Sequence, residues 1–251
     1  MNAEGLRCLD ECLRDVAETL VVAPDRERSA VSHSLTIHSS LELNRIGFHR
    51  FTLNGTPADC VIYALTRLMT SQPDLVISGI NHGANLADDI MYSGTVAAAR
   101  EASRHGIPAL AVSQAYDKKP IRFDRGTRFM RMLVETLLAK KPKPGICLNV
   151  NIPVGSIRGV RITRQGCTLH FPHFNSLYLD GDSEYDGRSS GELKRPELQL
   201  DFQAVVEHCV SITPLQRDQT DYLLAQSLHE EVAQSLQPRR FPRMGLIRHK
   251  K

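Results

Sequence analysis

The chain has 251 residues, 41% hydrophobic and 24% charged, a length and composition typical of one α/β domain of a soluble protein. Its net charge of +3 arises in the basic tail 237–251, which holds six Lys or Arg and no acid. The other 236 residues carry a net charge of −3, so they lack the basic face that binding of a nucleic acid would need. No apolar run approaches the roughly 18 residues of a membrane span, and the acidic start excludes a secretory signal, so we expect a cytoplasmic protein with no membrane partner.

Apolar residues recur at spacings of three and four over the first twenty positions, which predicts a helix with one buried face: Leu6, Leu9, Leu13, Val16 and Leu20. The segment 19–24 then predicts a short buried strand, and two further strands are expected at 34–43 and 48–53. Thr56-Pro57-Ala58-Asp59 predicts the start of a second helix, because Thr caps, Pro fits the first turn and the acid answers the cap.

Strand and helix patterns alternate from there to residue 151. The apolar run 74–80 is of the parallel-sheet kind, and the segment 95–102 is helical and closed by Gly106. A strand at 107–113, a helix at 122–139 and a strand at 147–151 follow. This alternation predicts a three-layer α/β fold with a mostly parallel sheet.

The pattern breaks between about 164 and 207, where a polar, glycine-bearing stretch is flanked by short β-like pieces. We expect a protruding β-hairpin arm at about 164–204, then a strand at 205–213 and a last helix that ends near Leu236. The predicted core therefore comprises residues 1–163 and 205–236, followed by the basic tail 237–251.

The six cysteines are scattered, and we expect free, mostly buried thiols instead of a disulfide framework. Cys8 and Cys12 lie one helical turn apart, a spacing that a metal or a redox pair could use. Since no second Cys or His cluster lies nearby to complete a tetrahedral site, free thiols are the better interpretation.

Two predicted strand ends carry polar loops, and ligands bind at the carboxyl ends of strands in open α/β sheets. One loop is 23–29; the other is 78–85, which continues to Tyr92-Ser93-Gly94-Thr95 at a predicted helix start. Small hydroxyl residues and glycine there expose backbone N–H groups and the positive end of the helix dipole, which favours a phosphate. An ordinary helix cap without a ligand is the alternative. The loop has neither the lysine of a Walker motif nor a GxGxxG fingerprint.

Several blocks resemble, in order, the SurE (stationary-phase survival) family of nucleotidases: APDRERSAVSHSLT, NGTPADCV, PDLVISGINHGANLADDIMYSGTVAAA, LNVNIP, RITRQG and VSITPLQRDQTD. The resemblance extends to about residue 235. It implies a Rossmann-like core, a C-terminal arm used in oligomer contacts and a homodimer or homotetramer. It also implies metal-dependent hydrolysis of nucleoside 5′- and 3′-monophosphates.

Residue by residue, the resemblance implies two metal ligands, Ser29 and Asn81. It implies a phosphate site made by four residues: Asn85, Ser93, Gly94 and Thr95. These are hard oxygen ligands and anion donors, so the expected cofactor is one Mg²⁺ or Mn²⁺ per subunit.

The chain departs from the family at its start. The family opens with a strand that ends in Asn-Asp-Asp-Gly, whose two aspartates are the anionic metal ligands, and Met1 matches the residue after that glycine. We therefore expect a misplaced start or a truncation, and an impaired enzyme whose catalytic aspartates precede Met1. Asp88 and Asp89 match acids that complete members also carry, so they are not expected to compensate.

For the complete protein the expected mechanism is in-line attack on phosphorus by a metal-bound water, with the helix start at Ser93–Thr95 neutralising the phosphate oxygens. His82 and His33 are interpreted as spectators in preference to general bases. Asp25 and Arg26 are interpreted as residues that support their loop. The alternative function is a non-catalytic phosphate- or nucleotide-binding oligomeric protein.

Overall fold

The computed structural model describes residues 3–117, 121–166 and 198–229. Contacts divide the chain into two units, 1–215 and 216–251. The second unit contains helix α7 (Tyr222–Leu228). Asp221 caps the start of this helix, because its side chain accepts a hydrogen bond from the Leu224 N–H. All other elements belong to the first unit.

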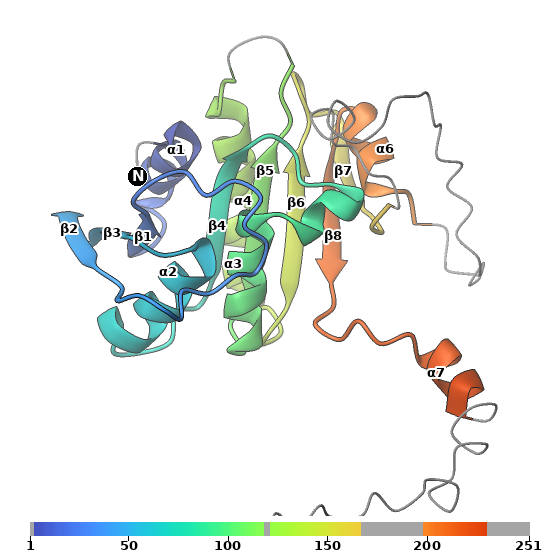
Figure 1. The fold of residues 1–251 in the computed structure, drawn as a ribbon. Coiled ribbons are helices and arrows are strands. Elements are labelled where there is room, and N and C mark those ends of the chain that lie inside the picture. The colour runs from blue at the N-terminus through green and yellow to red at the C-terminus, as the bar shows by residue number, and fades with distance from the viewer. Residues whose placement is uncertain (1–2, 118–120, 167–197, 230–251) are drawn as a thin grey trace, which may run out of the picture. The chain divides into compact units, whose positions relative to one another are not determined.

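The first unit contains two separate sheets (Figure 1). The small sheet has the order β1-β3-β2, with β1 and β3 parallel and a β2–β3 hairpin: β1 (Val21–Pro24), β2 (Leu43–Gly47) and β3 (Arg50–Leu53). The large sheet has the order β4-β5-β6-β8-β7, and only its β6–β8 pair is antiparallel: β4 (Val76–His82), β5 (Ala109–Gln114), β6 (Cys147–Ile152), β7 (Gly159–Ile162) and β8 (Cys209–Leu215).

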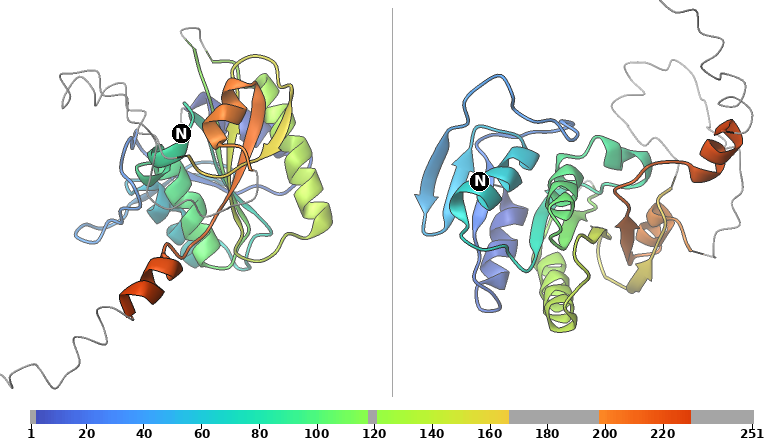
Figure 2. Two further views of the ribbon diagram at one scale, coloured as in Figure 1. Left: turned by 90° about the vertical axis from the view of Figure 1, so that its right-hand side faces the viewer. Right: turned by 90° about the horizontal axis from the view of Figure 1, so that it is seen from below.

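Helices cover both faces of the large sheet (Figure 2). On one face α1 (Glu4–Leu13) packs against α4 (Asp124–Lys140). On the other face α2 (Pro57–Tyr63) packs against α3 (Gly94–Arg104). Strand β5 shows the division, because Leu110 and Val112 join the core under α4 while Ala109 and Ala111 join the core under α3. The predicted three-layer, mostly parallel α/β fold is confirmed. Within the described ranges, no helix combines the length and apolar character needed to cross a membrane.

The predicted start of α2 is confirmed in detail. The Asp59 N–H donates to Thr56 Oγ1 at 3.1 Å, and Asp59 Oδ2 accepts from the Thr56 N–H at 2.8 Å, with Pro57 in the first turn. This reciprocal cap satisfies two N–H groups that a helix start would otherwise leave free. Beyond Tyr63 the helix continues as a short π-helical turn, η1 (Ala64–Leu68).

Two predicted strands were wrong in their bounds. Residues 34–42 form no strand, because their backbone bonds to the start of α2 instead of to a neighbouring strand: the Thr36 N–H donates to the Asp59 carboxylate, and Thr56 Oγ1 donates to the Ser34 carbonyl at 2.8 Å. The strand expected from 205 begins only at Cys209, since an unpredicted helix, α6 (Asp201–Val206), occupies the residues before it. Strand β7 was also not predicted.

A set of hydrogen bonds joins the two chain segments that flank residues 167–197. The Arg164 N–H donates to the Gln199 carbonyl and the Asp201 N–H donates to the Arg164 carbonyl, both at 3.0 Å. The Gly166 N–H donates to Asp201 Oδ1 at 3.1 Å, although the two residues lie 35 positions apart. We call this set the clasp. Most of the hairpin arm expected at 164–204 lies outside the described residues.

Candidate functional site

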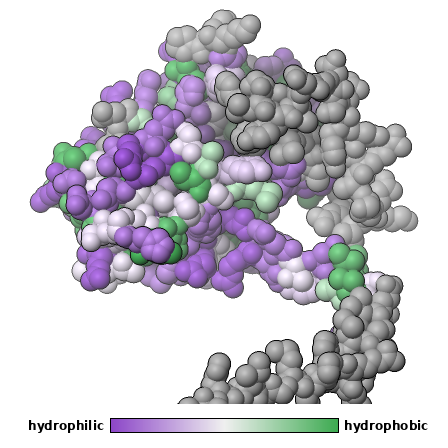
Figure 3. Space-filling model, in the orientation of Figure 1, coloured by the Kyte–Doolittle hydropathy of each residue, from purple (hydrophilic) through white to green (hydrophobic). Residues whose placement is uncertain are grey.

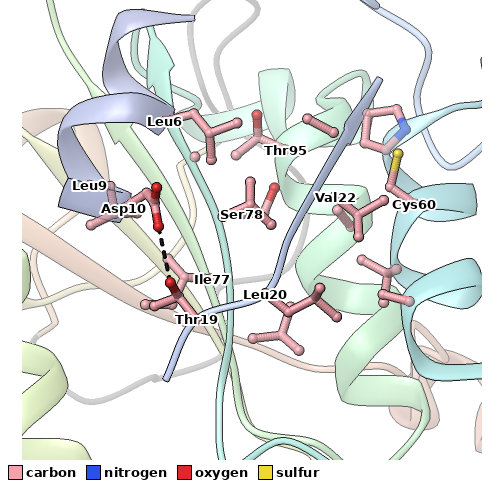
Figure 4. A pocket seen from close by; sticks show the side chains of 18 of the residues that line it. Leu6, Leu9, Asp10, Thr19, Leu20, Val22, Cys60, Ile77, Ser78 and Thr95 are labelled. Atoms are coloured by element: carbon pink, nitrogen blue, oxygen red, sulfur yellow. Dashed lines mark hydrogen bonds between the residues drawn. The ribbon is translucent and has the colours of Figure 1, made fainter. Parts of the chain in front are cut away.

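A cavity of about 2190 Å³ lies between the two sheets, lined by β1 and β4 and by the helices around them. Figure 4 shows Leu20 and Val22 of the β1 segment, Ile77 and Ser78 of β4, and Leu6 and Leu9 of α1 around it. Helix α1 touches both sheets: Asp10 accepts hydrogen bonds from Thr19 Oγ1 at 3.0 Å and from Arg50 Nε at 2.9 Å, and Gly5 packs so closely on the Ile80 carbonyl that a Cβ would lie 2.2 Å from it.

One end of this cavity is polar, and it lies where β1 and β4 have their carboxyl ends. The residues that line it there include every site residue expected from the sequence: Ser29, Asn81, Asn85, Ser93, Gly94 and Thr95. All six expected site residues therefore line one and the same cavity. Asp25, Arg26 and His82 line the same end, whereas Asp88 and Asp89 do not line the cavity.

The loop after β1 is fastened to the start of α3. The Ser32 N–H donates to the Tyr92 carbonyl at 2.9 Å, and Ser32 Oγ donates to the Met91 carbonyl at 2.7 Å. Gly94 permits the approach, because a Cβ there would lie 3.0 Å from Pro57 Cγ and 3.1 Å from Val31 Cγ2. These contacts position Ser29, whose hydroxyl donates to Glu27 Oε1 at 2.7 Å.

The start of α3 presents backbone donors to the polar end of the cavity. Ser93 is the N-cap and its Oγ accepts the Val96 N–H at 3.1 Å, which leaves the first-turn N–H groups of Gly94 and Thr95 without helical partners. Together with the positive end of the helix dipole, these groups suit a phosphate oxygen.

A buried asparagine cluster holds Asn85. Its N–H donates to Asn151 Oδ1 at 2.8 Å, and its carbonyl accepts from Asn149 Nδ2 at 2.8 Å and Asn151 Nδ2 at 2.9 Å. Its side-chain amide donates to Ser113 Oγ at 2.5 Å, so both backbone and side chain are fixed. These four hydrogen bonds hold Asn85 at the cavity wall, although Asn149 Oδ1 is buried without a partner among the described residues.

The donors available for a divalent cation are incomplete. Asn81 uses its amide nitrogen to donate to the Gly83 carbonyl at 2.9 Å, which leaves its Oδ1 as an acceptor; Ser29 lines the same cavity. Both donors are hard oxygens of the type that Mg²⁺ takes, but both are neutral. Across the described parts of the chain, no group of three or more His, Cys, Asp or Glu side chains could hold a metal ion. The described residues alone therefore do not fit a tightly held cation.

The two histidines singled out in the sequence have structural neighbours. The His82 ring lies against Tyr116, with ring centroids 4.6 Å apart. His33 Nε2 lies 2.8 Å from the buried carboxylate of Glu101. Burial raises the pKa of the Glu101 carboxyl, but the hydrogen bond from His33 and the charge of Arg104 outweigh it, so this pKa lies below its usual value.

Sequence reasoning missed the residues that support the site from behind. Asn149 and Asn151 alternate with apolar residues in β6, and buried asparagines at alternate positions of a strand are a signal that could have been used. Asp201 gave no such signal. Its buried carboxylate accepts the Ala87 N–H at 2.8 Å and thereby holds the loop after Asn85, and burial raises the pKa of this carboxyl.

A mostly parallel α/β sheet that is covered by helices on both faces, with a helix start at its carboxyl edge, defines a protein of the Rossmann-like class. Comparison with known families then places the chain: the profile described as Survival protein SurE matches residues 1–170, and the chain belongs to this family.

Curated relatives agree with this assignment. The chain is 40% identical over 226 residues to the 5'-nucleotidase SurE of Geobacter metallireducens, covering 88% of this chain and 90% of the relative. It is 42% identical over 228 residues to the 5'-nucleotidase SurE of Nitrosococcus oceani, covering 88% and 89%. The crystal structure of the SurE protein from Aquifex aeolicus superposes with a TM-score of 0.75 at 34% identity, covering 91% of this chain and 94% of that one.

Proposed function

We propose that the chain is a phosphoric monoester hydrolase whose substrates are nucleoside 5′- and 3′-monophosphates. The relatives named 5'-nucleotidase support the reaction class. The observation that supports the proposal for this chain is that Asn85 and the start of α3 line the same large cavity, so that a phosphate bound there would find donors already held in place.

In this proposal the phosphate lies against the N–H groups of Gly94 and Thr95, and Asn85 orients it from the side. Donors fixed before the substrate arrives need no reorganisation when negative charge grows on the phosphate oxygens, and this lowers the barrier. The cavity behind them gives room for a nucleoside. Ser93 fixes the first turn of α3 and thereby the direction of the N–H groups.

A divalent Mg²⁺ or Mn²⁺, one per subunit, is part of the proposal, with Ser29 and Asn81 as its neutral ligands. Such a cation would supply charge neutralisation on the phosphate. Because these two residues alone do not fit a tightly held cation, we expect the 251-residue chain to hydrolyse nucleotides slowly and to bind them more readily than it turns them over.

The test is phosphate release from AMP with Mn²⁺ or Mg²⁺, with and without chelator, beside calorimetric AMP binding. Asn81→Ala should reduce the metal dependence, and Ser93→Ala should mainly weaken AMP binding. Thr136→Ala, on an exposed face of α4, is the matched control and should change neither. Metal-independent AMP binding without any phosphate release would favour the alternative, a non-catalytic nucleotide-binding protein.

We also propose that the chain forms a homodimer or homotetramer through the segment 164–204. The β-like sequence pattern of the N-terminal flank of this segment supports pairing with another subunit, whereas its C-terminal flank continues into helix α6. Sedimentation of the chain with residues 176–197 deleted, which leaves Gln199 and Asp201 of the clasp in place, tests the idea: loss of the oligomer is expected, and an oligomer that survives the deletion refutes it.

A further inference from the structure

Ala87 lies two residues after Asn85, and both of its backbone groups are bonded to the segments that flank residues 167–197. Its N–H donates to Asp201 Oδ2 at 2.8 Å, and its carbonyl accepts from Gln165 Nε2 at 3.1 Å. Ala87 is buried and has a φ of +50°, in the left-handed region that a residue with a Cβ rarely adopts. Such a conformation persists only where the surroundings hold it, so these two bonds hold the backbone at this point.

Asp201 is an unusual place for a charged side chain. On the face shown in Figure 3, hydrophilic residues cover most of the surface and apolar residues form small, separate groups among them. Asp201 is instead 0% exposed, and burial of a carboxylate is costly unless its oxygens are bonded. Oδ1 accepts from the N–H groups of Phe202 at 2.9 Å and Gly166 at 3.1 Å, while Oδ2 accepts from Ala87. One carboxylate therefore joins the clasp to the loop after Asn85.

The loop that Asp201 holds leads to both parts of the proposed phosphate site. In one direction a single residue separates Ala87 from Asn85, which is held from β5 and β6. In the other direction Ala87 begins a short 3-10 helix, η2 (Ala87–Met91), which ends two residues before Ser93, the cap of α3. A displacement of Ala87 therefore moves Asn85 and disturbs the approach to the start of α3.

The far end of η2 is fastened as well. Ser32, in the loop after β1, donates through its N–H to the Tyr92 carbonyl and through its hydroxyl to the Met91 carbonyl. Because this end of η2 is already held, the bonds at Ala87 decide where the other end lies relative to Asn85.

We propose that Asp201 is a positioning residue for the phosphate site, acting through the Ala87 N–H, and that Gln165 has the same role through the Ala87 carbonyl. Asp201 keeps Asn85 and the start of α3 at the spacing that a bound phosphate requires. The ligand, a nucleoside monophosphate, rests on the function proposed above, whereas the contact itself can be measured without a ligand. By linkage, AMP binding must stabilise the contact by as much as the contact strengthens AMP binding.

Asp201→Asn tests this role, because it keeps the shape of the side chain. An amide has one acceptor oxygen, and Gly166 and Phe202 together offer it two donors where Ala87 offers one. The NH2 group then faces the Ala87 N–H, and two donors cannot bond. We expect the Kd for AMP, measured by calorimetry, to rise about five- to tenfold. Gln165→Ala, which leaves the carboxylate in place, should raise it about twofold.

Thr163→Val is the matched control for a general loss of stability. Thr163 is 1% exposed, and its hydroxyl bonds to Ser211 Oγ at 2.8 Å and Thr213 Oγ1 at 2.7 Å. The substitution removes buried hydrogen bonds close to the clasp without touching Ala87. We expect it to lower the urea midpoint of unfolding as Asp201→Asn does, yet to leave the Kd for AMP unchanged.

Amide hydrogen exchange, followed by NMR on the full chain, measures the contact without a ligand. The Asn85 amide is the informative site, because its own partner Asn151 is untouched in Asp201→Asn. We expect it to exchange at least about tenfold faster in this variant, relative to the Leu110 amide in β5. In Thr163→Val the same ratio should stay at the wild-type value. AMP added to the wild-type chain should slow exchange in the clasp.

An unchanged Kd for AMP in Asp201→Asn would overturn the positioning role, as would an unchanged Asn85 exchange ratio or an equal loss of affinity in Thr163→Val. A wild-type chain that binds no AMP, with Asn85 exchange that rises selectively in Asp201→Asn, would count against the proposed function alone and leave the contact in place. If circular dichroism shows that Asp201→Asn does not fold, Gln165→Ala serves for the same comparisons.

Discussion

His33 Nε2 and Glu101 Oε2 lie 2.8 Å apart, across 68 residues of sequence. This contact joins the loop that carries Ser29 to the helix whose start faces the cavity. Glu101 also accepts from Arg104 Nε and lies 3.2 Å from His105 Nε2, so one buried carboxylate organises three basic side chains. The two halves of the candidate site are thus connected behind the cavity as well as at Ser32.

Removing this carboxylate should cost more than removing an exposed partner. Glu101→Ala leaves His33 without its bond and should lower the free energy of unfolding by about 2–4 kcal/mol. Arg104→Ala, which removes a mostly exposed partner of the same carboxylate, should cost no more than about 1 kcal/mol. Urea unfolding of both variants measures the difference, and equal costs would contradict a role for the His33 contact.

The carboxylate in the cap of α2 should make the free energy of unfolding depend on pH. Burial raises the pKa of the Asp59 carboxyl, but hydrogen bonds from Thr36 and Thr56 outweigh it and hold this pKa below its usual value. A lowered pKa stabilises the folded state at neutral pH, and this contribution is lost as pH falls below about 4 and through the folded-state value. Asp59→Asn should lower the free energy of unfolding by about 1–2 kcal/mol at pH 7. Unfolding curves of the two proteins should converge in strong acid; a constant difference would be the contrary result.

Replacement of Asn149 and replacement of Asn151, the two β6 members of the asparagine cluster, should lower the free energy of unfolding by different amounts. Asn151→Ala leaves the Asn85 N–H buried without a partner and should cost about 2–3 kcal/mol in unfolding, with weaker AMP binding. Asn149→Ala should cost less, because the Asn85 carbonyl keeps its bond from Asn151 and the unpartnered Asn149 Oδ1 disappears. Calorimetry of AMP binding and urea unfolding test both variants, and the reverse order would refute this account of the cluster.

Gly94 should be required for the approach of the loop after β1. In Gly94→Ala the new Cβ would meet Pro57 and Val31 at 3.0 and 3.1 Å, so the loop must move away from α3. We expect weaker AMP binding with little change in helix content, since alanine is a better helix former than glycine. Gly106→Ala, where a Cβ meets nothing within 4 Å but the φ of +82° disfavours alanine, should instead reduce stability alone. Unchanged AMP binding in Gly94→Ala would contradict the packing argument.

Local patterns predicted most of the elements, because each carried its own signal. The four residues of the α2 cap are enough to predict the start of that helix, and the apolar runs of β4, β5 and β6 predict buried parallel strands. The strand predicted at 34–43 was wrong over residues 34–42, although their composition is β-like. Their backbone bonds to the start of α2 at Asp59, a partner that no local pattern reveals. The predicted site residues line one cavity, whereas a support such as Asp201 acts on Ala87 across more than a hundred positions, a distance that no local pattern reveals. The division into two sheets depends on which strands pair, and pairing is a property of the whole chain.

The clasp has a practical consequence for the segment between its ends. Since Arg164 and Gly166 are bonded to Gln199 and Asp201, the core receives the same two anchored chain ends whatever the sequence between them. Loop-closure cost rises only slowly with length, by about 0.6 kcal/mol per doubling, so insertions and replacements between the anchors should be inexpensive. Replacement of residues 167–197 should therefore spare the fold of the core, because Asp201 continues to hold Ala87 beside the site, even where the replacement removes the proposed oligomer contact.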